Sequence, residues 1–246
     1  MRVSRLFVAQ ELAPEAEVAL PAQAAHYVQR VLKLRVGDAL VLFNGDGADY
    51  AGSLALVSKN QVLIALHARL PAVPESKLQI TLAQAIGKGD RMDYAVQKAT
   101  ELGVTAIQPL FTKRTEVRLQ GARLERRMAH WLGTLRAACE QCGRAVVPEL
   151  LPARTLDQWQ ASDPSAVRLV LTPEASSSLG ELRPPTGPIT VLVGPEGGFA
   201  EEEIQQLKLA ACQTIRLGPR VLRTESAGPA VLAALQTLWG DFNAIG

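Results

Sequence analysis

The sequence predicts an α/β fold in two parts, a small β-rich N-terminal region and a larger region built on a mostly parallel sheet. In residues 1 to about 70, short apolar runs are separated by turn signals, which is typical of strands. From Leu78 onward, short apolar runs alternate with segments of helical periodicity, as in a parallel sheet covered by helices on both faces. The chain has 246 residues, of which 48% are hydrophobic, enough for a large buried core.

In the N-terminal region, apolar runs of strand length predict strands at 18–20, 39–43, 50–56 and 61–66. The tetrapeptide Asn44-Gly45-Asp46-Gly47 predicts a tight turn between two of them, because Asn-Gly and Asp-Gly favour hairpins. One short helix is expected over residues 22–31. Strands at this spacing predict a small barrel.

The segment 71–76 contains two prolines and predicts a linker to the second region. A strand is expected over 78–86, and a helix follows over 90–102. Asp90 is the expected N-cap of this helix, and Gly103 marks its end.

The rest of the chain continues the alternation of strands and helices. Arg123 to Ala138 is the longest helical pattern, with Leu124, Met128 and Leu135 on one face. A helix over 200–210 begins with three glutamates, which suit the positive end of a helix dipole, and a last helix is expected over 226–239. Further apolar runs predict strands at 104–111, 146–151, 167–172, 189–194 and 214–217.

Charge and apolar run lengths restrict the class of protein. The net charge of +2 is too small to identify a nucleic-acid-binding protein, so any basic surface must be local. The N-terminus has no long apolar core followed by small residues, so we expect no secretory signal. No apolar run approaches the roughly 20 residues of a membrane span. We therefore expect a cytoplasmic protein without a membrane partner.

The three cysteines include a Cys-x-x-Cys pair, Cys139 and Cys142, which occurs in metal and redox sites. The pair lies late in a helical pattern, no second such pair exists, and the three histidines are scattered along the chain. Structural zinc needs four ligands, so this pattern favours ordinary structural thiols, and we expect no metal.

The glycine-rich segment Gly194-Pro195-Glu196-Gly197-Gly198-Phe199 lies between an apolar run and a helical pattern. A loop there exposes helix N-terminal N–H groups, and its glycines let a ligand approach the backbone. The segment is neither a P-loop nor a dinucleotide fingerprint, because the required lysine and glycine spacing are absent. The alternative is a tight turn shaped by Pro195 and the glycines.

The second motif, residues 217–227, lies between a short apolar run and the last helix. Thr224 as N-cap and Glu225 near the positive helix end would explain two of its polar residues. They do not explain Arg223, because a cation at a helix N-terminus is unfavourable. An anionic partner, such as a phosphate or a negatively charged intermediate, explains it better. The two motifs are expected to form two walls of one small-molecule pocket.

A basic stretch follows the strand expected at 104–111. The stretch contains eight cationic residues and three glutamates, Glu116, Glu125 and Glu140, which gives it a local net charge of +5. A solvated helix face and a contact surface for a phosphate backbone both fit this stretch, and its bias toward arginine favours the second. Its members are Lys113, Arg114, Arg118, Arg123, Arg126, Arg127, Arg136 and Arg144.

Together, the two C-terminal motifs resemble those of the RsmE family of small-subunit ribosomal RNA methyltransferases. Other segments similar to this family cover most of the chain, namely residues 5–7, 26–32, 37–38, 88–93, 96–104, 140–144 and 147–148. Ser226 departs from the threonine that is more common in the family, but it keeps the hydroxyl group.

The resemblance implies a PUA-like RNA-binding β-barrel over residues 1–72 and a SPOUT methyltransferase domain over 73–246. It implies a C-terminal trefoil knot, which no pattern in the residues could reveal. It also implies S-adenosylmethionine (SAM) as cofactor, a homodimer, and methylation of uridine N3 in 16S ribosomal RNA within the small ribosomal subunit.

The resemblance also implies roles for individual residues. Arg223 would stabilise the negative charge that a uridine gains on losing its N3 proton, and Glu225 or Glu196 would accept that proton or orient the base. Arg5 would join the site from the N-terminal domain of the partner subunit. SAM would be bound by Leu171, Thr172, Pro173, Leu192, Gly194, Pro195, Glu196, Gly197, Gly198, Leu217, Gly218, Leu222, Thr224 and Ala227. RNA would be bound by Arg2, Arg5, Arg30, Lys88, Arg91, Arg114 and Arg220.

Other functions stay open at this point. A methyltransferase of the same fold could act on another nucleotide or on a ribose 2′-OH. The chain could also be a non-catalytic RNA-binding module that uses the barrel and the basic helix. A nucleotide hydrolase is disfavoured by the missing P-loop lysine.

Overall fold

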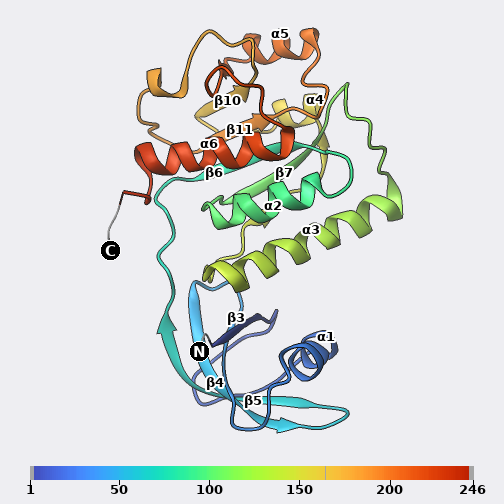
Figure 1. Cartoon of the computed structure of the whole chain (residues 1–246), viewed down its shortest axis with the longest axis vertical. Coiled ribbons are helices and arrows are strands. Elements are labelled where there is room, and N and C mark those ends of the chain that lie inside the picture. The colour runs from blue at the N-terminus through green and yellow to red at the C-terminus, as the bar shows by residue number, and fades with distance from the viewer. Residues whose placement is uncertain (1–2, 164, 244–246) are drawn as a thin grey trace. The chain divides into compact units, whose positions relative to one another are not determined.

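The computed structural model describes residues 3–163 and 165–243, which form two compact units (Figure 1). The first unit contains residues 1–75 and 136–147, and the second contains 76–135 and 148–246. The sequence assigns 136–147 to the second region, whereas the structure groups this segment with the first. The predicted domain boundary after residue 72 stays a prediction.

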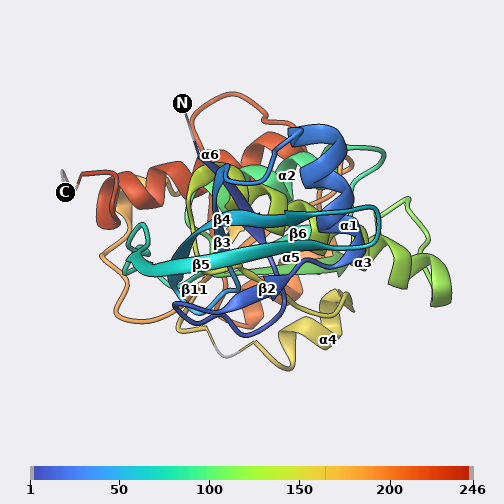
Figure 2. The same cartoon turned by 90° about the horizontal axis from the view of Figure 1, so that it is seen from below.

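The first unit contains a five-stranded sheet in the order β1-β3-β4-β5-β2. Strand β1 pairs in parallel with β3, and the other neighbours are antiparallel. Figure 2 shows β4 and β5 side by side as two long strands. The bounds are β1 Ser4–Phe7, β2 Glu17–Ala19, β3 Ala39–Phe43, β4 Ala48–Val57 and β5 Val62–Pro71.

The four predicted strands of this unit are present, and two details differ from expectation. Strand β1 was not predicted, because Arg5 interrupts its short apolar pattern. The helix expected over 22–31 consists of a short α-helix, α1 (Ala22–His26), continued by a π-helical segment (Tyr27–Leu32).

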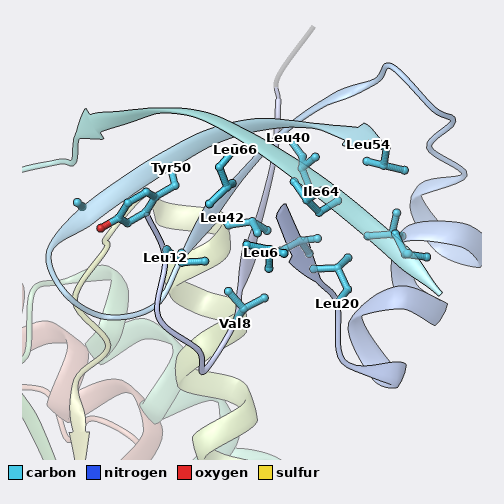
Figure 3. Packing of buried hydrophobic residues seen from close by; sticks show 14 residues of the cluster. Leu6, Val8, Leu12, Leu20, Leu40, Leu42, Tyr50, Leu54, Ile64 and Leu66 are labelled. Atoms are coloured by element: carbon cyan, nitrogen blue, oxygen red, sulfur yellow. The ribbon is translucent and has the colours of Figure 1, made fainter. Parts of the chain in front are cut away.

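Alternate residues of the strands build the core of the first unit. On β4, Tyr50 and Leu54 are buried, and Leu42 of β3 and Ile64 of β5 are also buried. Figure 3 shows these side chains in one cluster with Leu6 of β1. The alternation of buried and less buried residues therefore builds one apolar face of the sheet.

The second unit contains a parallel sheet in the order β12-β10-β11-β6-β7-β8, with β9 pairing beside β7. This confirms the predicted α/β class with a parallel sheet. The strands are β6 Ile80–Ala85, β7 Ala106–Phe111, β8 Glu149–Leu150, β9 Arg154–Thr155, β10 Val167–Leu171, β11 Ile189–Val193 and β12 Gln213–Ile215.

Helices cover both faces of this sheet (Figure 1). Helices α2 and α6 pack together on one face, where Gly228 of α6 lies against Leu82 of β6. On the other face, Trp159 of α4 and Leu207 of α5 pack against Ala83 and Leu192. The helices are α2 Arg91–Glu101, α3 Gly121–Cys142, α4 Leu156–Gln160, α5 Glu201–Leu209 and α6 Thr224–Trp239.

Helix α4 was missed although its sequence carries a start signal. Thr155 and Gln158 form a capping box, in which each side chain bonds the other residue's backbone N–H. This Thr-x-x-Gln spacing is a recognised helix start.

The strand order decides where the site lies. Strands β12, β10 and β11 are neighbours, so the loops that leave their carboxyl ends emerge at the same edge of the sheet. These loops contain the two C-terminal motifs. That the chain is knotted here stays a prediction.

Candidate functional site

A pocket of about 820 Å³ opens at this edge of the sheet, within the second unit. The glycine-rich loop 194–199 and the segment 217–225 both line it, which confirms that the two motifs are walls of one pocket. The loop after β10, residues 172–175, supplies a third wall.

Most residues predicted to bind a cofactor line this pocket. Leu192 is the exception, because its side chain is buried in the core under α4 and α5. The lining residues among those predicted are Leu171, Thr172, Pro173, Gly194, Pro195, Glu196, Gly197, Gly198, Leu217, Gly218, Leu222, Thr224 and Ala227. Their roles toward a ligand stay predictions.

The glycine-rich loop is tight, and two of its glycines are needed for its shape. A Cβ on Gly194 would lie 3.2 Å from the carbonyl carbon of Gly198 and from the amide nitrogen of Phe199. Gly198 has a φ of +68°, in the left-handed region that favours glycine, and its N–H donates to the carbonyl of Pro195. The loop is thus both a tight turn and a wall of the pocket.

Thr224 joins the two motifs directly. Its hydroxyl donates to the carbonyl of Gly194 at 2.6 Å and accepts from Nε2 of Gln84 at 3.0 Å. The prediction that Thr224 caps the last helix is wrong, because Thr224 is the first residue of α6 and its hydroxyl is used by Gly194. The N-cap position belongs to Arg223, whose side chain makes no capping hydrogen bond.

Two carboxylates face the pocket in different environments. Glu196 accepts hydrogen bonds from the backbone N–H of Lys88 at 2.9 Å and from the guanidinium of Arg91. Burial opposes ionisation of Glu196, but these bonds and its own backbone N–H outweigh it and lower its pKa below the ordinary 4.5. Within the described part of the chain, Oε2 of Glu225 is buried and has no hydrogen-bond partner, with Nε of Arg91 at 3.8 Å.

The predicted catalytic arginine of the second motif lies at the edge of the pocket. Arg223 is exposed, as is Arg220, and both line the pocket. Among residues 3–163 and 165–243, neither guanidinium has a hydrogen-bond or ion-pair partner. A cation at a helix start without an anionic protein partner is available to an anionic ligand.

The residues predicted to bind RNA lie in different places and have different partners in the structure. Lys88 pairs with Glu116, and Arg114 donates to the carbonyl of Gly197 at 2.8 Å while lining the pocket. Arg30 is exposed on the π-helical segment of the first unit, whereas Arg2 lies outside the described residues.

The basic stretch is not one continuous surface. Arg127 donates to the carbonyl of Gly89. Arg136 lies over the ring of Phe7, and Arg144 is buried beside Glu75, both within the first unit. A phosphate-binding surface therefore cannot use all eight cations together.

The sequence did not indicate the role of Glu203, which holds the residue that follows the glycine-rich loop, Ala200, together with Lys113. Its buried carboxylate accepts the N–H groups of Lys113 at 2.7 Å and Ala200 at 2.8 Å. A glutamate three residues after the helix start was a signal for the second bond. No local signal indicates the first, which joins residues 90 positions apart.

Arg5 is held firmly within the first unit. Its guanidinium forms two hydrogen bonds with Asp49, at 2.6 and 3.1 Å, and donates to the carbonyls of Cys139 and Arg144. It also lies 4.5 Å over the ring of Phe43, and its side chain is only 11% exposed. These contacts attach the end of α3 to β1, and a catalytic role for Arg5 stays a prediction.

Replacing Arg5 with alanine should destabilise the first unit by about 3 kcal/mol, because Asp49 and two carbonyls would lose their donor. This corresponds to a fall in melting temperature of about 6–12 °C, measured by thermal denaturation. Arg5→Lys, which keeps the charge but not the two-point geometry, should give an intermediate loss. An unchanged melting temperature for Arg5→Ala would contradict the structural role.

The Cys-x-x-Cys pair lies at the end of α3 with both thiols free. Burial raises the pKa of Cys139 to about 12, so its thiol is protonated at neutral pH.

No helix in the described part of the chain is both long enough and apolar enough to cross a membrane.

Two family models match the chain. A model described as an RNA methyltransferase domain matches residues 74–236, and one described as an RNA methyltransferase PUA domain matches residues 20–66. The first match contains the whole lining of the pocket.

Solved structures and curated relatives are similar over nearly the whole chain. A methyltransferase of Legionella pneumophila in complex with the cofactor SAM has a TM-score of 0.95 and 38% identity, covering 98% of this chain and 100% of that one. The ribosomal RNA small subunit methyltransferase E of Neisseria gonorrhoeae, bound to SAM, has a TM-score of 0.92 with the same identity and coverage. The protein of that name from Rickettsia conorii is 31% identical and covers 97% of both chains.

Proposed function

Because the chain belongs to the ribosomal RNA small subunit methyltransferase E family, we propose that it methylates N3 of a uridine in 16S ribosomal RNA, with SAM as methyl donor. The observation that carries the proposal is the pocket formed by both C-terminal motifs, with two carboxylates inside and, at its edge, an arginine that has no partner among the described residues. Its substrate is the 16S ribosomal RNA of the small ribosomal subunit.

The residues of the pocket fit SAM chemically. SAM carries a positive sulfonium, an adenine and a ribose, and the pocket offers carboxylates together with a glycine-rich backbone that a ligand can approach closely. Oε2 of Glu225, which has no hydrogen-bond partner among the residues that the structure describes, fits a site completed by an N–H-bearing or cationic ligand. When bound, SAM supplies the methyl group. The lining residues named above are proposed to hold it.

The protein's part in the reaction is to make the uridine nucleophilic. Uridine N3 reacts poorly while it carries its proton, and loss of that proton places negative charge on O2 and O4. Arg223 is proposed to stabilise this charge, since its guanidinium has no anionic partner among the described residues. Glu225 is proposed to accept the proton in preference to Glu196, whose carboxylate already accepts two donors and whose pKa is lowered.

Methylation of isolated small subunits tests this proposal. The subunits are incubated with the protein and labelled SAM, and the digested nucleosides are identified by mass spectrometry. We expect 3-methyluridine. A 2′-O-methyl nucleoside or another methylated base would favour the related methyltransferase activities, and absence of SAM binding in calorimetry would favour a non-catalytic RNA-binding module.

The homodimer implied by the resemblance and the cytoplasmic location expected from the residues belong to the same proposal. Sedimentation of the purified chain should give twice the monomer mass of 26.4 kDa. For Arg5 of the partner subunit to contribute to the site, its bonds with Asp49 would have to open or be shared.

Substituting Gly194 with alanine should weaken SAM binding by about tenfold, because the added Cβ forces the loop to move at three contacts of 3.2 Å. Isothermal titration calorimetry measures the effect. Gly133→Ala is the matched control, since a Cβ there meets nothing within 4 Å. Equal SAM affinities for the two variants would mean that the loop does not bind the cofactor.

A further inference from the structure

Arg91 lies at the start of α2, where a cation is unfavourable because the positive end of the helix dipole is close. Two carboxylates from distant parts of the chain offset this cost. Its guanidinium donates to Glu196 of the glycine-rich loop, and its Nε lies 3.8 Å from Oε2 of Glu225 on α6. The bond with Glu196 is the main cause that raises the pKa of Arg91, so it stays charged.

The three side chains form one cluster in the pocket, here called the Arg91 cluster (Arg91, Glu196 and Glu225). Its members come from three elements, the start of α2, the loop after β11 and the start of α6. Glu196 is fixed from a second side by the backbone N–H of Lys88 at 2.9 Å. The side chain of Glu225 is 18% exposed, and Nε of Arg91 lies 3.8 Å from its buried Oε2.

From this geometry we infer that Arg91 is a positioning residue for methyl transfer, which holds the Glu225 carboxylate in place through the Arg91 cluster. The inference rests on the proposed function. It replaces a direct RNA contact for Arg91, because the guanidinium is already engaged by two carboxylates that line the pocket.

The two roles differ in what a substitution changes. A residue that binds an RNA phosphate contributes to affinity, and its loss weakens RNA binding and reduces the salt dependence of binding. Substitution of a residue that positions Glu225 lowers the rate at saturating SAM and saturating small subunits. The same substitution has no further effect on the rate in a variant whose Glu225 has already been replaced.

The test compares single-turnover methylation of small subunits by the wild type, Arg91→Ala, Arg91→Lys, Glu225→Gln and the double variant Arg91→Ala/Glu225→Gln. We expect Arg91→Ala to lower the saturated rate by about 10- to 100-fold, with subunit affinity changed less than about threefold. Arg91→Lys should recover part of the rate. The double variant should be within about twofold of Glu225→Gln.

Each opposite result overturns the inference. A wild-type saturated rate for Arg91→Ala with weakened subunit binding would assign Arg91 to RNA, and fully additive losses in the double variant would separate it from Glu225. Thermal denaturation of the same variants separates an effect on rate from unfolding. Inactivity of the wild-type protein would instead contradict the proposed function, so the two failures are distinguishable.

Discussion

Arg223→Ala is expected to slow methyl transfer by about 100- to 1,000-fold and to leave SAM affinity within about threefold. The reason is electrostatic, because a donor aimed at developing negative charge acts mainly in the transition state. Arg223 is suited to this role because it is exposed at the pocket edge and its guanidinium is unpaired within the described part of the chain. The measurement is the single-turnover rate with small subunits and saturating SAM, with calorimetry for SAM affinity.

Arg183→Ala is the matched control, since Arg183 is exposed and does not line the pocket. It removes the same charge and should keep the wild-type rate. A near wild-type rate for Arg223→Ala with normal SAM binding would show that the base is stabilised by another group. A loss of SAM affinity equal to the loss of rate would place Arg223 in cofactor binding.

Glu225→Gln should lower the rate by about 100- to 10,000-fold, because glutamine has nearly the same shape but cannot accept a proton. Its residual rate should rise steadily with pH, since solvent hydroxide can then remove the N3 proton. A pH–rate profile from about pH 6 to 9 measures both effects.

Glu149→Gln, at an exposed carboxylate on β8, is the control for this change of charge. It should leave the rate and its pH dependence unchanged. If Glu225→Gln retained the wild-type pH profile and rate, Glu225 would be a structural residue at the first turn of α6, where a carboxylate favours the positive helix end.

Patterns within a few residues predicted most of the elements. The period of two on β4 and the helical period of α3 depend on near neighbours, so they are visible in a single sequence. Strand β1 was missed because its four residues include Arg5, whose charge is neutralised by Asp49, 44 positions away. No local pattern contains that pairing.

In the site, too, local patterns were visible in the sequence and contacts between distant residues were not. The glycines and Arg223 were identified as parts of one pocket because both motifs lie between a strand and a helix, where glycines let a ligand approach the backbone and a cation is unfavourable without an anionic partner. Only the capping role of Thr224 was predicted wrongly, because Arg223 takes the N-cap position and the Thr224 hydroxyl bonds Gly194, 30 positions earlier. The resemblance predicted an RNA contact for Arg91, and its hydrogen bond with Glu196, 105 positions away, was not visible in the sequence.

The α/β class, the two pocket-forming motifs and the resemblance that points to methyl transfer all follow from the order of residues along the chain. The pairing of Glu196 with Arg91 and the hydrogen bonds of Arg5 within the first unit follow from the three-dimensional structure alone. The same is true of the buried Oε2 of Glu225, which has no hydrogen bond within the described part of the chain. The reason is that periodicity reports which face of an element is buried. Which distant residues meet depends on strand order, here β10, β11 and β6 as neighbours, and on the packing of α2 beside α6.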